Sequence, residues 1–442
     1  MERTQRLTIR VAAMAVAASV VAGCGAASTP TDEAAALSAS PTVFVTPATS
    51  QLATPTTIST PATVATPTPA ATPSHVPAGS TLSWKSVLSS DGDPLGSNLT
   101  AAVAFGDGFV VAGNENQGQH AVIWYSADGK SWQKIDKAQD FSDGVIGTLV
   151  PIPQGLLAVG TASQPDSRCG GGAFGCNAVS AIRLWTSPDG RAWHALASSV
   201  VVPFGRAQLI QVVSGPSGVV AFGELVPVTG TDTTAMVWNS PNGLAWEREP
   251  QFSTAFPSDT IVDLAAGPAG FEAVGSRSAG GNLTGPRRAW FSSDGKTWKL
   301  GSGPATRGPT VVMACTAGFF GVDNPSAQAS FWTTADGVKW TVQPGVVGRP
   351  DLPTYVGQGL FSDGNRILAI GADSFQTPGA WLSTDGRQWE SIALSGPQPP
   401  IDTAVAGSVA AAFSSSGVLV TTATQSLQGA TNWTIWLGTL SR

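Results

Sequence analysis

From residue 81 onward, the chain alternates short apolar runs with turns rich in Gly, Asp and Pro. One stretch contains the apolar run 260–267 (TIVDLAAG), a short turn and a second run, 271–276 (FEAVGS). After a polar, Gly-rich loop come RRAWFSS (287–293) and KTWKL (296–300), which an Asp-Gly turn connects. Runs of this length bounded by turn residues predict β-strands. No amphipathic stretch of helical period and convincing length follows residue 80, so the expected fold is all-β.

One phrase recurs, with Trp at both ends and Asp-Gly or Asn-Gly in the middle, as in WYSADGKSW (124–132). The first Trp of each copy lies at position 124, 185, 238, 290, 332 or 381, so the spacings are 61, 53, 52, 42 and 49 residues. A repeat of about 50 residues that contains only strand signals is typical of β-propeller blades with four strands each.

The tryptophans predict the number of blades. Seven lie on expected third strands, at 124, 185, 238, 290, 332, 381 and 436. Another seven lie on expected fourth strands, at 84, 132, 193, 246, 298, 340 and 389, which leaves only Trp433. The last repeat lacks a fourth strand, while TLSWKSVL (81–88) precedes the first repeat. We therefore predict a seven-bladed β-propeller of four-stranded blades, closed by its N-terminal strand.

The phrase itself predicts a β-hairpin. We expect a three-residue turn, with Trp124 opposite Trp132 and Gly129 in a left-handed conformation. The Asp side chain, as at Asp128, is expected to accept hydrogen bonds from nearby backbone N–H groups. The paired indoles would pack between blades.

This phrase resembles the Asp-box, or BNR repeat, of sialidases, sortilins and related propellers. The family pattern is Ser-x-Asp-x-Gly-x-x-Trp, whereas here Gly follows Asp directly, so each copy is one residue shorter. The resemblance covers about seven positions in each of six copies. It implies a folding element that lies far from any catalytic centre, and therefore supports the fold without indicating an activity.

The N-terminus has the features of an export signal, with Arg3, Arg6 and Arg10 before an apolar run at 11–22. The segment VAGC, ending at Cys24, resembles the lipobox of bacterial lipoproteins. This resemblance implies removal of residues 1–23 and lipid attachment to Cys24, so the protein would be extracytoplasmic and membrane-anchored, on the cell surface or in the periplasm. The alternative is an ordinary secretory signal.

Residues 24–80 are dominated by Ala, Thr, Pro and Ser. Such a segment buries too little apolar surface to offset its chain entropy, so we expect a disordered tether. The predicted organisation is thus a signal peptide (1–23), a tether (24–80) and a propeller (81–442).

Composition excludes several kinds of function. The formal charge is −6 and only 12% of residues are charged, which argues against a nucleic-acid surface. The three His are not at ligand spacing, so we expect no metal site and no cofactor. In an exported protein, Cys169 and Cys176 across a Gly-rich loop predict a disulfide, whereas Cys315 is expected to be a small buried residue.

Connection lengths point to a binding face. The turns between first and second strands and between third and fourth strands are short, whereas the other two sets of connections are long and varied. The two sets lie at opposite ends of the blades, so one face is built from elaborated loops. Candidate ligand-binding residues on that face are Arg206, Asp259, Arg307, Arg349, Asp351, Tyr355 and Asp402. The alternative is that these are solvated loop charges.

We expect a non-catalytic protein that binds a protein or glycan partner through this long-loop face. One alternative is a sialidase-like glycoside hydrolase or lyase. That chemistry requires an arginine triad and a Tyr nucleophile, and the chain has no clear triad and only two Tyr, Tyr125 and Tyr355. A further alternative is an assembly factor for a membrane complex.

Overall fold

The computed structural model describes most of the chain from residue 80 onward. The described residues are 80–90, 98–115, 120–135, 141, 144–165, 179–228, 234–249, 259–277, 287–303, 308–323, 330–343, 359–372, 378–401, 409–415, 417–425 and 431–441. The predicted signal peptide, Cys24 and nearly all of the tether therefore lie outside the described residues. All described residues belong to one compact unit.

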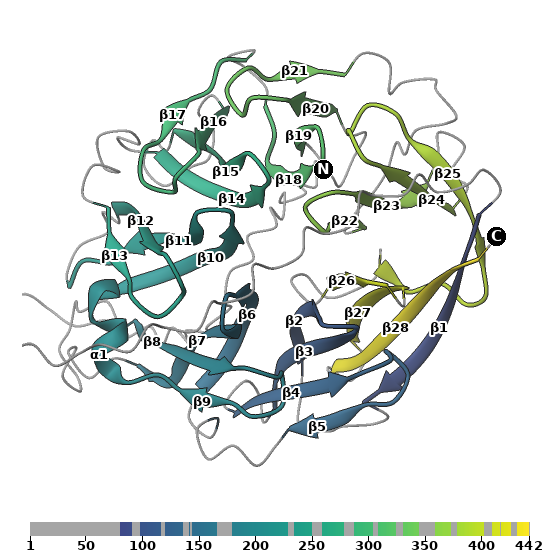
Figure 1. Cartoon of the computed structure of the whole chain (residues 1–442), viewed down its shortest axis with the longest axis horizontal. Helices are drawn as coiled ribbons and strands as arrows, with labels where there is room; N and C mark the ends of the chain where they lie inside the picture. Colours follow the sequence, from purple (N-terminus) through teal and green to yellow (C-terminus); the bar gives the residue numbers. More distant parts are fainter. Residues whose placement is uncertain are drawn as a thin grey trace, which may run out of the picture. The chain divides into compact units, whose positions relative to one another are not determined.

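Five four-stranded antiparallel sheets follow one another along the chain (Figure 1). The first comprises β2 (Asn98–Phe105), β3 (Gly108–Glu115), β4 (His120–Ser126) and β5 (Gln133–Ile135). The second comprises β6 (Gly144–Ile152), β7 (Gly155–Pro165), β8 (Ser180–Ser187) and β9 (His194–Ala195). The third comprises β10 (Ala207–Gly215), β11 (Gly218–Leu225), β12 (Thr234–Ser240) and β13 (Glu247–Arg248). The fourth comprises β14 (Asp259–Gly267), β15 (Gly270–Arg277), β16 (Arg287–Ser292) and β17 (Lys299–Leu300). The fifth comprises β18 (Val311–Cys315), β19 (Gly318–Val322), β20 (Phe331–Thr334) and β21 (Thr341–Val342).

The remaining strands form one eight-stranded sheet in the order β22-β23-β24-β25-β1-β28-β27-β26. Its members are β22 (Leu360–Ser362), β23 (Ile367–Ala372), β24 (Pro378–Ser383), β25 (Glu390–Ser395), β26 (Ala410–Ser414), β27 (Gly417–Gln425), β28 (Thr431–Ser441) and β1 (Thr81–Ser89). β1 pairs antiparallel with β28 and parallel with β25. The sheet thus consists of two four-stranded antiparallel halves, and the predicted pairing of the first strand with the last is confirmed (Figure 1).

The hydrophobic core lies between consecutive sheets. One cluster, for example, joins Val220 and Val237 of the third sheet to Phe271 and Trp290 of the fourth. Another joins Phe109 of the first sheet to Leu419 and other residues of the half that contains β26, β27, β28 and β1. The burial of both faces explains why the second strands are nearly continuous apolar runs. The all-β architecture of four-stranded antiparallel sheets is consistent with a β-propeller.

The first strands of neighbouring sheets are joined by polar side chains as well as by apolar contacts. The Thr100 hydroxyl donates to the Ile146 carbonyl oxygen at 2.7 Å, and the Leu264 N–H donates to Gln211 Oε1 at 2.8 Å. The Val312 N–H likewise donates to Asp263 Oδ2 at 2.8 Å. β2, β6, β10 and β14 each contain a register irregularity near these positions. Polar side chains from or next to the irregular positions thus satisfy backbone groups of the neighbouring sheet.

The repeated phrase forms a hairpin, but its predicted register is wrong. Trp124 lies opposite Lys134, not Trp132, and Trp238 likewise lies opposite Arg248. The predicted left-handed glycine is confirmed, with φ of 73° at Gly129. The turn is longer than expected because the Asp128 carboxylate takes up backbone N–H groups that a tighter hairpin would use in its ladder.

The second Trp of the phrase closes the turn instead of pairing with the first. The indole N–H of Trp132 donates to the Gly129 carbonyl oxygen at 3.2 Å, and that of Trp193 donates to the Gly190 carbonyl oxygen at 3.0 Å. The fourth strand, such as β5, begins one residue after this Trp.

Candidate functional site

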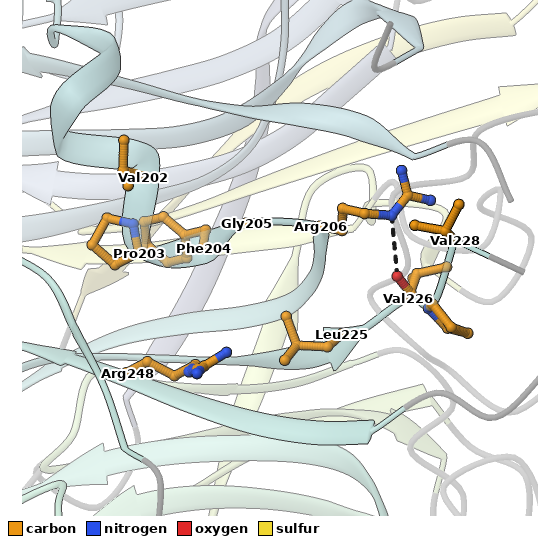
Figure 2. A pocket seen from close by; sticks show the side chains of 10 residues that line it. Val202, Pro203, Phe204, Gly205, Arg206, Leu225, Val226, Val228 and Arg248 are labelled. Carbon is orange, nitrogen blue, oxygen red and sulfur yellow. Dashed lines mark hydrogen bonds between the residues drawn. The ribbon is translucent and has the colours of Figure 1, made fainter. Parts of the chain in front are cut away.

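Two long connections meet beside the third sheet and enclose a pocket of about 600 Å³ (Figure 2). One connection precedes β10 and contains the short helices α1 (Ser198–Val201) and η2 (Val202–Phe204). The other follows β11. We call this the arginine pocket; it is lined by residues 202–206, 225–228 and Arg248. It lies at the end of the sheet where the long connections emerge.

The wall formed by η2 is anchored on the two tryptophans of the repeated phrase. The Trp238 indole N–H donates to the Pro203 carbonyl oxygen at 2.9 Å. The Phe204 ring is fully buried, and its centroid lies 5.4 Å from that of Trp238 and 5.1 Å from that of Trp246. Gly205, with φ of 57°, ends the helix and donates its N–H to the Val202 carbonyl oxygen at 3.1 Å. The two tryptophans thus support the pocket from beneath without lining it. The strand that follows Trp246 contributes one lining residue, Arg248.

Arg206 connects this wall to the opposite one. Its carbonyl oxygen accepts from the Val226 N–H at 3.0 Å, and its Nε donates to the Val226 carbonyl oxygen at 3.3 Å (Figure 2). These bonds extend the β10–β11 ladder beyond its last strand residues. The position of residues 225–228 relative to η2 is therefore set by the chain itself, before any ligand binds.

The pocket combines cationic and apolar groups. Val202 and Val228 are 71% and 52% exposed, although both are aliphatic. Arg248 extends from β13 toward Leu225, while Arg206 lies at the other end of the pocket (Figure 2). Among the described residues, those that line the pocket include two arginines and no acidic side chain.

The acidic residues beside Arg248 are engaged elsewhere. Glu247 forms an ion pair with Lys296, with Oε2 at 3.5 Å from Nζ, and Glu249 accepts a hydrogen bond from the Asn239 amide. Arg248 makes no ion pair with any residue in the described part of the chain. Arg248 therefore places a cationic group in the arginine pocket, in a chain with a formal charge of −6.

Only one of the predicted ligand-binding residues can be placed at this pocket. Arg206 lines it, and Asp259 begins β14, opposite Arg277, in the next sheet. The remaining five lie outside the described residues, namely Arg307, Arg349, Asp351, Tyr355 and Asp402. The predicted disulfide between Cys169 and Cys176 also lies outside them. Cys315 is buried as predicted, and burial raises the pKa of its thiol to about 11.

Sequence reasoning missed Arg248, Val202 and Val228. Arg248 lies two residues after the end of a repeated phrase, on the short strand β13, and nothing in its local sequence marks it as a binding residue. The exposed valines carry no signal of their own, because isolated aliphatic residues in a loop are common on protein surfaces. Phe204, in the middle of a long connection, was the available clue that the loop is anchored to the sheet.

The aspartates of the repeated turns are structural. Asp128 Oδ1 accepts from the N–H groups of Lys130 and Ser131, both at 2.8 Å. These backbone bonds lower the pKa of Asp128, with the Ser131 bond contributing most. Backbone bonds likewise lower the pKa values of Asp189 and Asp336. Carboxylates held ionised in this way stabilise turns and are poorly suited to donate a proton at neutral pH.

Glu272 of β15 is a fully buried carboxyl group that the sequence did not single out. Its Oε1 accepts from the Trp340 indole N–H at 3.1 Å, and its Oε2 has no hydrogen-bond partner among the described residues. Burial raises the pKa of Glu272 well above the usual carboxyl value, with nearby Asp336 contributing in the same direction. No group of three or more metal-ligating side chains is found among the described residues.

A second cavity, of about 400 Å³, lies at the opposite end of the second and third sheets, among their short turns. It is lined by residues 151–153, 214–219 and Pro241, and none of these described lining residues carries a charge. Among the described residues, no helix has the length and apolar character needed to cross a membrane.

No protein-family model matches the chain, and no curated protein matches it. Among solved structures, the chain is similar to Trypanosoma rangeli sialidase in complex with sialic acid, at 12% identity and a TM-score of 0.38, over 82% of this chain and 59% of that one. It is also similar to the S511A mutant of puromycin hydrolase complexed with PGG, at 13% identity and a TM-score of 0.46, over 76% of this chain and 53% of that one. AofleA from Arthrobotrys oligospora aligns at 11% identity and a TM-score of 0.38, over 72% of this chain and 91% of that one. The chain thus spans less than two thirds of the sialidase and of the hydrolase, and the similarity is a distant one of fold.

Proposed function

We propose that this protein is a lipid-anchored, extracytoplasmic β-propeller that binds a protein or glycan partner through its long-loop face and does not act as an enzyme. The observation that carries the proposal is the arginine pocket. It places cationic and exposed apolar groups on a preorganised surface, at the end of a sheet where the long connections emerge.

A seven-bladed architecture is part of this proposal. The topology supports it, because five four-stranded sheets and the two halves of the eight-stranded sheet make seven four-stranded units. The seven hydrophobic clusters found among the described residues support it as well, since each joins two consecutive units and one joins the last unit to the first. The pairing of β1 with β28 would close such a ring.

The cellular location rests on the N-terminal sequence. Three Arg, an apolar run and VAGC ending at Cys24 support export and lipid attachment. A tether of more than fifty residues before the first strand would hold the propeller away from the membrane.

Site-specific photocrosslinking in the intact lipoprotein tests the binding face. A benzophenone amino acid replaces Val228, which is 52% exposed in the arginine pocket, and the cells are irradiated. We expect one dominant crosslinked species, which mass spectrometry identifies as a protein or a glycan.

The matched control places the same benzophenone at Val342, which is 47% exposed on β21, two sheets further along the chain. This position should give no such product. Equal capture at both positions, or no capture at Val228, would contradict binding through this part of the long-loop face. Cys24→Ser should release the protein from membranes. A Cys24→Ser variant that stays in the membrane fraction as the wild type does would contradict the lipid anchor.

A further inference from the structure

We infer that the arginine pocket binds an extended acidic peptide segment of a partner protein, in which aliphatic residues lie next to a carboxylate that pairs with Arg248. The inference rests on the proposed function, in which the long-loop face binds a partner, and it specifies the chemistry of the ligand at one pocket.

The charge of Arg248 favours an anionic ligand group. Arg248 extends toward Leu225, at the end of the cavity away from Arg206, where its guanidinium would meet an anionic group of the ligand (Figure 2). A guanidinium presents a planar fork of donors that matches a carboxylate. Since Glu247 and Glu249 are engaged with Lys296 and Asn239, Arg248 remains available to an incoming acid.

The surface between the arginines favours aliphatic contacts. Val202, Leu225, Pro227 and Val228 line the cavity, and the two valines are among the most exposed large apolar residues in the described part of the chain. Covering two solvent-exposed valines with an apolar ligand group removes apolar surface from water, which contributes favourable binding free energy.

The same lining favours a peptide over an acidic glycan. Sugar rings commonly stack on exposed aromatic faces, because their apolar C–H faces suit a flat ring. The one aromatic side chain among the described lining residues, that of Phe204, is 1% exposed because its ring packs against Trp238 and Trp246. A peptide with Leu or Val beside Glu or Asp supplies both the apolar contact and the carboxylate.

Preorganisation makes the pocket suited to a short segment. The Trp238–Pro203 and Arg206–Val226 hydrogen bonds hold both walls in the absence of a ligand. Because the walls are already held in place, the protein loses little conformational entropy when a peptide binds.

An array of blocked octapeptides, probed with the purified full-length protein, tests the inference. Each member carries Leu, Val or Pro between two Glu residues, and each has a counterpart with Gln at both acidic positions. We expect the Glu peptides to bind at least about tenfold more tightly than their Gln counterparts. Their binding should weaken as salt rises from about 0.1 M to about 0.5 M.

Variants of the protein locate the site. Arg248→Gln should weaken binding of the best Glu peptide about tenfold, and Val202→Ser should weaken it less. Lys299→Gln removes an exposed cation from β17 of the neighbouring sheet and should leave the affinity unchanged. In the wild-type protein, the NMR signal of the Arg248 Nε–H group should shift as the best Glu peptide is titrated in.

Three results would overturn the inference: equal binding of Glu and Gln peptides, undiminished binding by Arg248→Gln, or tighter binding of a uronic-acid or sialic-acid oligosaccharide than of any peptide. These outcomes are separate from the test of the proposed function. Crosslinking at Val228 that persists in Arg248→Gln would leave the binding face intact and remove only the acidic-peptide assignment.

Discussion

At the scale of single residues, Glu272 departs most from its surroundings. It lies on β15 opposite the residue that follows the first Trp of a repeated phrase. The six equivalent positions in the other units are all apolar and buried, namely Val110, Leu157, Val220, Phe320, Leu368 and Leu419. A carboxyl group here loses its hydration and recovers one hydrogen bond, from Trp340. We therefore expect Glu272 to make the contact between the fourth and fifth sheets sensitive to pH.

Glu272→Gln should remove this sensitivity. The raised pKa means that the folded protein keeps a proton which the unfolded chain releases as the pH rises above about 4.5. The free energy of unfolding of the wild type should therefore fall by up to about 1.4 kcal/mol per pH unit in this range, relative to the variant. Urea unfolding at several pH values between about 5 and 8 measures the difference. Glu247→Gln, which alters an exposed carboxylate, is the control, and parallel pH profiles for wild type and Glu272→Gln would contradict the expectation.

The turn aspartates illustrate the opposite case, in which a carboxylate is stabilised in its charged form. Asp189→Ala removes the acceptor for the N–H groups of Arg191 and Ala192 and should lower the melting temperature by about 2–4 °C. Asp189→Asn should cost much less, because Asn242 accepts the corresponding bonds in another copy of the phrase. The pKa of Asp189 is lowered, so the advantage over Ala should persist at neutral pH and vanish as acid protonates the carboxylate. Equal melting temperatures for the Ala variant and the wild type at neutral pH would argue against this role.

At the scale of elements, the long connections are held by the strands that they leave and enter. Phe204 packs on Trp238 and Trp246 in the third sheet. In the second sheet, Phe141 packs in the same way, at centroid distances of 5.8 Å from Trp185 and 6.3 Å from Trp193. In both sheets, an aromatic residue in the connection that precedes the first strand packs against the two tryptophans of the repeated phrase. The repeated phrase therefore supports the long-loop end of a sheet although its own turn lies at the other end.

Phe204→Ala and Phe141→Ala form a matched pair of variants. Both rings are buried, at 1% and 3% exposure, so each truncation should destabilise the protein by about 3–5 kcal/mol. Only Phe204→Ala removes the base of η2, so only this variant should also lose peptide binding at the arginine pocket, at a temperature where both variants are folded. Calorimetry and the peptide array separate the two effects. Equal loss of binding in both variants would show a general effect of stability.

At the scale of the whole described unit, the ends of the chain meet. β1 pairs with β28 over most of its length and also contacts β25, so the N-terminal strand joins two otherwise separate four-stranded halves. Trp84 and Leu82 of β1 are buried in the cluster between these halves. The strand therefore covers two sheet edges that would otherwise be exposed.

A disulfide between β1 and β28 tests this contact. Ser83 lies directly opposite Thr439, and facing residues of antiparallel strands have the Cα separation that a disulfide needs. Ser83→Cys with Thr439→Cys should form the bond and raise the free energy of unfolding by about 2–5 kcal/mol, because it closes nearly the whole domain into one loop. Thermal melts with and without reductant measure the gain, and Ser83→Cys alone is the control. A double variant that stays unbonded under oxidising conditions would contradict the pairing.

The sequence by itself determined the features that depend on neighbouring residues. The Asp-Gly pairs predicted turns with a left-handed glycine, as Gly129 shows, because φ near +70° strongly favours residues without a Cβ. The apolar runs predicted the strands, and the unmatched Trp84 predicted the partner of the last strand. Each of these signals lies within a few residues or in a count along the chain.

Only the tertiary structure decided the hairpin register, the burial of Glu272 and the composition of the arginine pocket. The register depends on which backbone N–H groups Asp128 takes up, and a two-residue change leaves the apolar alternation of the strands unaltered. Glu272 is buried because two sheets pack over it. Arg206, Val228 and Arg248 meet because the β10–β13 sheet brings distant segments together, and no local pattern encodes such a meeting.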